Sequence, residues 1–237
     1  MAISEVQWPA TVTLHELKSA EQLAWQLATD VAGRLRTAIA GQGRATLVVS
    51  GGRSPVAFFQ ALAQEALDWS KVTVSLADER WVPVEHADSN EGLLRRHLLT
   101  GNAAKARFVG LYRSAASLDA AAEAAEQALA ELPPIDVLVL GMGDDGHTAS
   151  LFPASPNLAD GLSLLSKRRC LPMLAPSVPH QRISLTRRLL ATAGFTVLSV
   201  QGAGKLATLR AALAGNELAQ MPIRAFLHDP LSIYWCP

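Results

Sequence analysis

Cysteine is scarce in this sequence, and the two that occur, Cys170 and Cys236, lie far apart. Because there is no C-x-x-C pair, we expect neither a disulfide framework nor a thiolate metal site, but two small buried thiols in a reducing cytoplasm. An excess of charge of one sign is also missing: 21 Lys and Arg balance 21 Asp and Glu, without a basic block. Neither nucleic acid nor an anionic membrane is therefore expected as a partner.

Long apolar runs are missing as well. No stretch of about eighteen apolar residues occurs, so no membrane-spanning helix is expected. The first nine residues include Glu5 and Pro9, where a secretory signal needs an apolar segment. With no visible repeat or flexible linker, residues 1–237 are predicted to form a single domain with a sizeable core.

Apolar runs typical of buried strands alternate along the chain with segments typical of helices. Ser19 begins a capping box, and Ser54 followed by Pro55 is a typical helix start. This alternation predicts an α/β fold with a doubly wound, largely parallel sheet and helices on both faces. The predicted strands are 45–49, 71–77, 135–140, 182–186 and 195–200, and the predicted helices are 19–41, 54–64, 89–99, 117–132 and 202–213.

The most informative segment is the glycine-rich stretch 141–153, which follows the predicted strand 135–140. Its first six residues match G-x-G-x-x-G, the pattern of dinucleotide-binding turns. However, Pro153 interrupts the helix that such a turn should open, and Asp144 and Asp145 would repel a pyrophosphate. The segment also supplies His147, so we interpret it as a turn that carries acid and base groups at the carboxyl edge of the sheet.

Four polar motifs follow predicted strands and should meet at this edge, since the exits of parallel strands lie together. Two of them favour an anion: residues 50–52 place backbone N–H groups before a helix, and residues 202–205 add the ammonium of Lys205. Because neither motif is a Walker A loop, the expected anion is a single phosphate ester. Taken singly, Lys205 is better explained as a solvated lysine in the first turn of a helix, and Asp78 with Arg80 is explained equally well as a structural ion pair. The other two motifs are residues 78–80 and 145–147.

Histidine spacing gives no sign of a metal centre. No H-x-x-x-H or other ligand spacing is present, so we expect no metal and interpret the remaining histidines as surface or packing residues. They are His15, His86, His97, His180 and His228.

In five stretches, in the expected order, the sequence resembles the 6-phosphogluconolactonases of the wider glucosamine-6-phosphate isomerase/deaminase-like group. The stretches are 49–55, 77–83, 141–153, 182–186 and 202–205. The resemblance implies cytoplasmic hydrolysis of 6-phospho-D-glucono-1,5-lactone to 6-phosphogluconate in the oxidative pentose phosphate pathway, without a cofactor. The related deaminases carry Asn-Glu-Pro where this chain has Leu151, Phe152 and Pro153. The missing acid favours lactone hydrolysis over isomerisation of an amino sugar phosphate.

Lactone hydrolysis requires a base for the attacking water and donors for the developing oxyanion. An imidazole, with an unperturbed pKa of about 6.5, suits the first task, so His147 is the predicted base and Asp145 orients its ring. The predicted oxyanion donors are backbone N–H groups of the turn that contains Gly143 and Gly146, together with Arg80. Asp78 is also predicted to bind the substrate. The phosphate is assigned to a clamp in which Arg53 is a weaker member and the main residues are Ser50, Gly51, Gly52, Arg182 and Lys205.

Two alternatives remain beside the lactonase. One is a non-catalytic sugar-phosphate sensor on the same fold, and the other is a deaminase-type isomerase. The lack of a DNA-binding segment and the presence of His147 count against the sensor. The sequence leaves the oligomeric state open, a monomer included.

Overall fold

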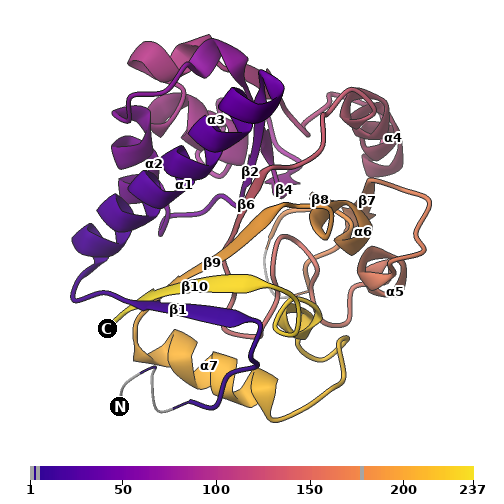
Figure 1. The fold of residues 1–237 in the computed structure, drawn as a ribbon. Coiled ribbons are helices and arrows are strands. Elements are labelled where there is room, and N and C mark those ends of the chain that lie inside the picture. The colour runs from indigo at the N-terminus through magenta and orange to yellow at the C-terminus, as the bar shows by residue number, and fades with distance from the viewer. Residues whose placement is uncertain (1–2, 4–5, 177–178) are drawn as a thin grey trace.

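The computed structural model describes residues 3, 6–176 and 179–237, so Glu5, on which the expectation about a secretory signal partly rests, lies outside it (Figure 1). Its main feature is a seven-stranded sheet in the order β1-β10-β9-β6-β2-β3-β5. All neighbouring strands of this sheet pair in parallel, which confirms the predicted parallel α/β fold. The strands are β1 (Val12–Glu16), β2 (Ala45–Val49), β3 (Val72–Leu76), β5 (Arg107–Val109), β6 (Val137–Leu140), β9 (Phe195–Gln201) and β10 (Leu231–Cys236).

The central strands are short and buried at every position, as expected when helices cover both faces of a parallel sheet. In Figure 1, α1 and α2 lie on one side of the sheet, and α7 lies on the other side, against β9. This confirms helices on both faces. The helices are α1 (Ala20–Gln42), α2 (Val56–Ala63), α3 (Asn90–His97), α4 (Leu118–Leu129), α5 (Leu158–Leu162), α6 (Arg187–Leu190) and α7 (Ala203–Leu213).

Capping residues set several helix starts. The Ser19 hydroxyl accepts from the Gln22 N–H at the start of α1, as its capping box predicts, and Gly43 ends that helix in the left-handed region with φ 76°. Ser54 does not play the predicted role, because α2 begins at Val56 with Pro55 at the N-cap position and receives no side-chain cap from the described residues.

A second, three-stranded antiparallel sheet was not predicted. It consists of β4 (Asp78–Arg80), β8 (Arg182–Leu185) and β7 (Cys170–Met173), with β8 in the middle. Residues 78–80 are therefore a strand, and 182–186, predicted as part of the main sheet, lies in the second one. The sequence prediction failed for two reasons. A three-residue strand is too short to show an alternation of apolar and polar residues, and Glu79 is wholly buried although glutamate is usually exposed.

Strands β1, β5, β7 and β10 were also missed. Both edge strands of the main sheet, β1 and β5, are among them, and partial exposure there weakens the apolar pattern on which prediction depends. The described residues include no helix that is both long and apolar enough to cross a membrane. Both cysteines are free and buried, as expected.

Candidate active site

A pocket opens where β2, β6 and β9 end, at the carboxyl edge of the main sheet, and the second sheet forms part of its wall. This is where open parallel sheets bind ligands. Residues of all four polar motifs therefore meet in one pocket at this edge of the sheet, as their positions in the sequence predicted. The lining includes ten of the predicted site residues: Ser50, Gly51, Gly52, Arg53, Asp78, Arg80, Gly143, His147, Arg182 and Lys205.

The turn after β6 joins His147 to Asp145, the predicted pair. Oδ1 of Asp145 lies 2.6 Å from Nδ1 of His147 and also accepts the backbone N–H of His147 at 3.0 Å. An ionised carboxylate only accepts hydrogen bonds, so Nδ1 carries the proton. In the neutral ring Nε2 is then the basic nitrogen, on a side chain that lines the pocket. The imidazole also packs on Phe152, with ring centroids 4.0 Å apart.

Two glycines of this turn stand where a side chain would clash or strain the backbone. A Cβ on Gly143 would lie 2.1 Å from the His147 ring, so glycine is what lets the imidazole fold over the turn. Gly146 has φ 77° and packs against Met221. The N–H of Gly143 donates to the His147 carbonyl, and the N–H of Gly146 donates to the Gly143 carbonyl. Both N–H groups are therefore already paired inside the turn.

The turn does not open a helix of the dinucleotide-binding type. After Pro153 the next helix, α5, begins only at Leu158, and it spans five residues. A pyrophosphate therefore has no long helix N-terminus at this position.

Asp78 connects the turn that contains His147 to the second sheet. Its Oδ2 accepts from the Ser150 hydroxyl at 2.5 Å and lies 3.8 Å from Nη1 of Arg182. Both Asp78 and Arg182 are buried, and burial lowers the pKa of Arg182 while Asp78 opposes this shift. Asp78 thus acts mainly as a support that holds Arg182 in place and fixes the end of the His147 turn.

Positive charge surrounds the pocket from several elements. Arg80 and Arg182 lie opposite each other in the β4–β8 pairing, while Arg53 is exposed before α2. Nε of Arg80 is buried without a partner among the described residues, although its Nη1 donates to the Asp88 carbonyl. Lys205, in the first turn of α7, forms an ion pair with Asp144 at 2.5 Å, which lowers the pKa of that exposed carboxylate.

The turn after β2 has an unused donor as well. The Ser50 hydroxyl is buried and has no partner among the described residues. A Cβ on Gly51 would lie 2.0 Å from Oδ1 of Asn90, and Gly52 has φ 93°. Asn90 lines the pocket and donates to the Asp78 carbonyl at 2.9 Å. Sequence reasoning missed Asn90, because it lies at the start of α3 rather than at the end of a predicted strand.

The buried carboxylate of Glu79 holds together two segments that line this side of the pocket, β4 and the start of α3. Its carboxylate accepts the backbone N–H groups of Arg80, Asn90 and Glu91, each at 2.7 Å, and the Ser89 hydroxyl at 3.2 Å. Burial raises the pKa of Glu79 to about 7, against the lowering effect of the three N–H groups. The buried carboxyl group therefore joins β4 to the first turn of α3.

Fold and site together define the class: a parallel α/β enzyme with a His–Asp pair in a pocket suited to a small anionic ligand. The model of the family described as glucosamine-6-phosphate isomerases/6-phosphogluconolactonase matches residues 18–235, and the chain belongs to that family.

Individual relatives agree with this assignment. A 6-phosphogluconolactonase from Pseudomonas putida is 75% identical over 237 residues, which cover 100% of this chain and 98% of that protein. One from Pseudomonas aeruginosa is 65% identical, with full coverage of both. The crystal structure of a 6-phosphogluconolactonase from Shewanella baltica superposes with a TM-score of 0.93 at 37% identity, covering 98% of this chain and 100% of that one.

Proposed function

We infer that this protein hydrolyses 6-phospho-D-glucono-1,5-lactone to 6-phosphogluconate, a step of the pentose phosphate pathway. Relatives named 6-phosphogluconolactonase at 75% and 65% identity support this activity. The observation that carries the chemistry is the 2.6 Å contact between Asp145 and Nδ1 of His147, because it leaves Nε2 as the basic nitrogen of a side chain that lines the pocket.

The proposed reaction uses water as the nucleophile. Nε2 of His147 takes a proton from the water as its oxygen attacks the lactone carbonyl, and Asp145 stabilises the resulting imidazolium. The carbonyl oxygen gains negative charge, and we assign the stabilisation of this charge to the guanidinium of Arg80, whose Nε has no partner among the described residues. When the ring C–O bond breaks, the imidazolium returns its proton to the leaving oxygen.

The phosphate is proposed to bind between the first turns of α2 and α7. Ser50 offers a free hydroxyl there, and residues 50–52 precede α2. An ammonium has three donors, so Lys205 can keep Asp144 and still donate to a phosphate. Arg182 adds a second cation, and Arg53 a third at the rim. Binding energy from this remote group then orients the lactone ring over His147.

The purified protein is expected to speed hydrolysis of the phosphorylated lactone but to leave glucosamine 6-phosphate unchanged. Phe152 stands where the deaminases carry a glutamate, and its ring packs on His147 instead of supplying a carboxylate. Lactone loss is measured with the spontaneous rate subtracted, and ammonia release is followed in parallel. Ammonia release at a rate comparable to lactone hydrolysis would contradict the assignment.

Replacing Lys205 with alanine is expected to lower kcat/KM for the phosphorylated lactone by roughly ten- to a hundredfold, since a charge-assisted hydrogen bond contributes about 1.5–3 kcal/mol. The unphosphorylated lactone should be little affected, because it lacks the group that Lys205 binds. Both lactones are assayed with the wild type, Lys205→Ala and the exposed control Lys167→Ala. Equal proportional losses on both substrates would show that Lys205 does not bind the phosphate.

The other expectations belong to the same proposal. Balanced charge supports the expectation of no nucleic-acid partner. Two free, buried cysteines support a cytoplasmic enzyme. One continuous set of buried apolar residues draws on both sheets, which supports a single domain over residues 1–237. The proposed reaction needs no redox cofactor and no metal at His147, since an imidazole suffices to activate the water.

A further inference from the structure

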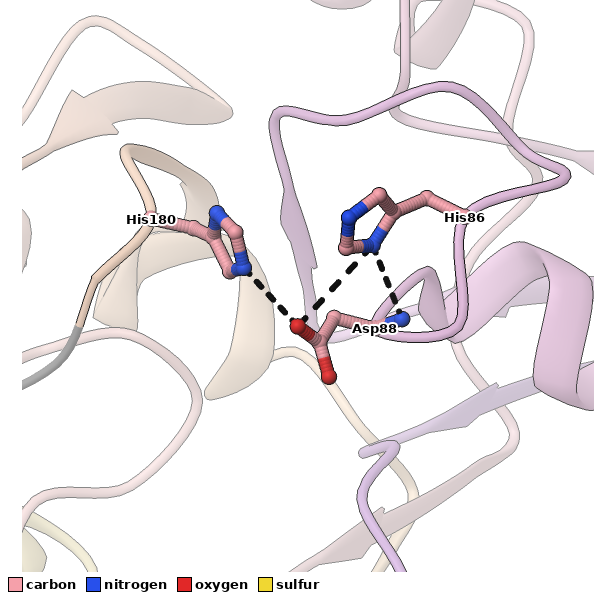
Figure 2. Close-up of side chains that lie close together, drawn as sticks. All are labelled: His86, Asp88 and His180. Carbon is pink, nitrogen blue, oxygen red and sulfur yellow. Dashed lines mark hydrogen bonds and ion pairs between the residues drawn. The ribbon is translucent and has the colours of Figure 1, made fainter.

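A second group of titratable side chains lies outside the pocket, between the loop that precedes α3 and the segment that precedes β8. Figure 2 shows His86 and Asp88 on the first segment and His180 on the second, with the carboxylate between the two rings. Oδ2 of Asp88 lies 2.8 Å from Nε2 of His180 and 3.9 Å from Nδ1 of His86. The pocket-lining residues include none of these three side chains.

We propose that His86, Asp88 and His180 form a binding site for a zinc ion, independent of lactone hydrolysis. One potential ligand atom from each residue lies within 4.8 Å of the other two. Zinc–ligand bonds of about 2.0–2.2 Å in tetrahedral geometry place ligand atoms roughly 3.4 Å apart. The 2.8 Å contact therefore has to open, and the 3.9 Å contact has to close, by roughly half an ångström each.

The donor set selects the kind of metal. Two imidazoles and one carboxylate suit zinc and its transition-metal neighbours, whereas Mg²⁺ and Ca²⁺ take oxygen ligands. The three protein ligands come from exposed or half-exposed side chains, so water can occupy the fourth position. The carboxylate of Asp88, which lies between the two rings, supplies the negative charge that favours a cation.

The hydrogen bonds of the cluster also orient the ligand atoms. The backbone N–H of Asp88 donates to Nδ1 of His86 at 3.1 Å, so the lone pair of that nitrogen faces Asp88. Zinc binding exchanges this bond for a metal–nitrogen bond. At His180 zinc takes the place of the proton that Nε2 shares with Asp88, and this proton leaves to solvent.

The position of the site gives it a consequence for the pocket. Nη1 of Arg80 donates to the Asp88 carbonyl at 2.6 Å, and Nε of Arg182 donates to the His180 carbonyl at 3.2 Å. A zinc ion would join the two segments on which these arginines are anchored. We therefore expect zinc to stabilise this region of the fold, without taking part in the chemistry at His147.

The test is isothermal titration of untagged, chelator-treated protein with zinc chloride. The wild type should bind one zinc ion per chain at this site, and His180→Ala and Asp88→Asn should each weaken this binding by at least about tenfold, since even outer-shell changes cost that much. The controls are His228→Ala, an exposed histidine elsewhere, and His147→Ala, which removes the other His–Asp pair. Both controls should bind zinc as the wild type does.

Thermal unfolding gives a second readout. Zinc should raise the Tm of the wild type and of both controls, and should have little effect on His180→Ala or Asp88→Asn. His86→Ala serves as a further variant should either of these fail to fold. The proposal is overturned if the wild type binds no zinc, or if His147→Ala loses binding while His180→Ala retains it, because zinc would then occupy the pocket.

Discussion

Alanine in place of His147 is expected to lower the turnover of 6-phosphogluconolactone by about 10²–10⁴-fold, the usual contribution of a general base. The variant loses Nε2 but keeps Arg80, Arg182 and Lys205, so substrate should still bind. Steady-state kinetics should therefore show the loss mainly in kcat. The wild-type rate should also decline towards acid pH, because an imidazolium cannot accept the proton of the attacking water.

Asp145→Asn and His228→Ala complete this experiment. Asparagine at position 145 can offer its amide oxygen to Nδ1 but not a negative charge, so an intermediate loss is expected. His228 is exposed and outside the pocket, and its replacement should leave kcat unchanged. If His147→Ala retained near-normal turnover, the water would have to be activated by a different group.

The second large effect is expected on stability, at Glu79. Alanine there leaves three backbone N–H groups and the Ser89 hydroxyl without their carboxylate acceptor in a buried site. Each orphaned donor costs about 1–3 kcal/mol, and partial hydration reduces the sum to roughly 3–5 kcal/mol. Denaturant unfolding at several pH values measures this loss. The matched control is Glu131→Ala, whose exposed ion pair with Arg107 should contribute less than about 1 kcal/mol.

The pH dependence of this loss has a definite sign. The pKa of Glu79 is raised by burial from 4.5 to about 7. The folded protein therefore holds this proton more tightly than the unfolded chain, and the resulting stability is fully present below pH 4.5 and is lost as the pH rises through about 7. The difference in unfolding free energy between wild type and Glu79→Ala should shrink by up to about 3 kcal/mol over that range. A difference that grows with pH would contradict a raised pKa.

The sequence predicted the parts of the fold and the site that depend on local patterns. Buried strands followed by glycine-rich turns were recognised, and their meeting at one edge follows from parallel topology. The second sheet was missed because residues 78–80 are too few for a pattern. Asn90 was missed because its contact with Gly51 comes from packing. The contact between His180 and Asp88 could not be predicted, because the two residues are 92 positions apart in the sequence. Spacing rules for metal ligands detect only neighbours on one element, and this cluster joins two.

The pairing of β1 with β10 has a consequence for how the protein is made. Strand β1 lies at the edge of the sheet, and its neighbour there is β10, with Val12 opposite Leu231. Strand β10 in turn lies between β1 and β9. A ribosome releases the chain from its N-terminus onwards, so residues 12–16 emerge long before their partner strand exists. The segments of β2, β3, β5 and β6 can assemble during synthesis, but β1 must wait, unpaired, until residues 231–236 have left the exit tunnel. Closure of that side of the sheet is therefore a late event of biosynthesis.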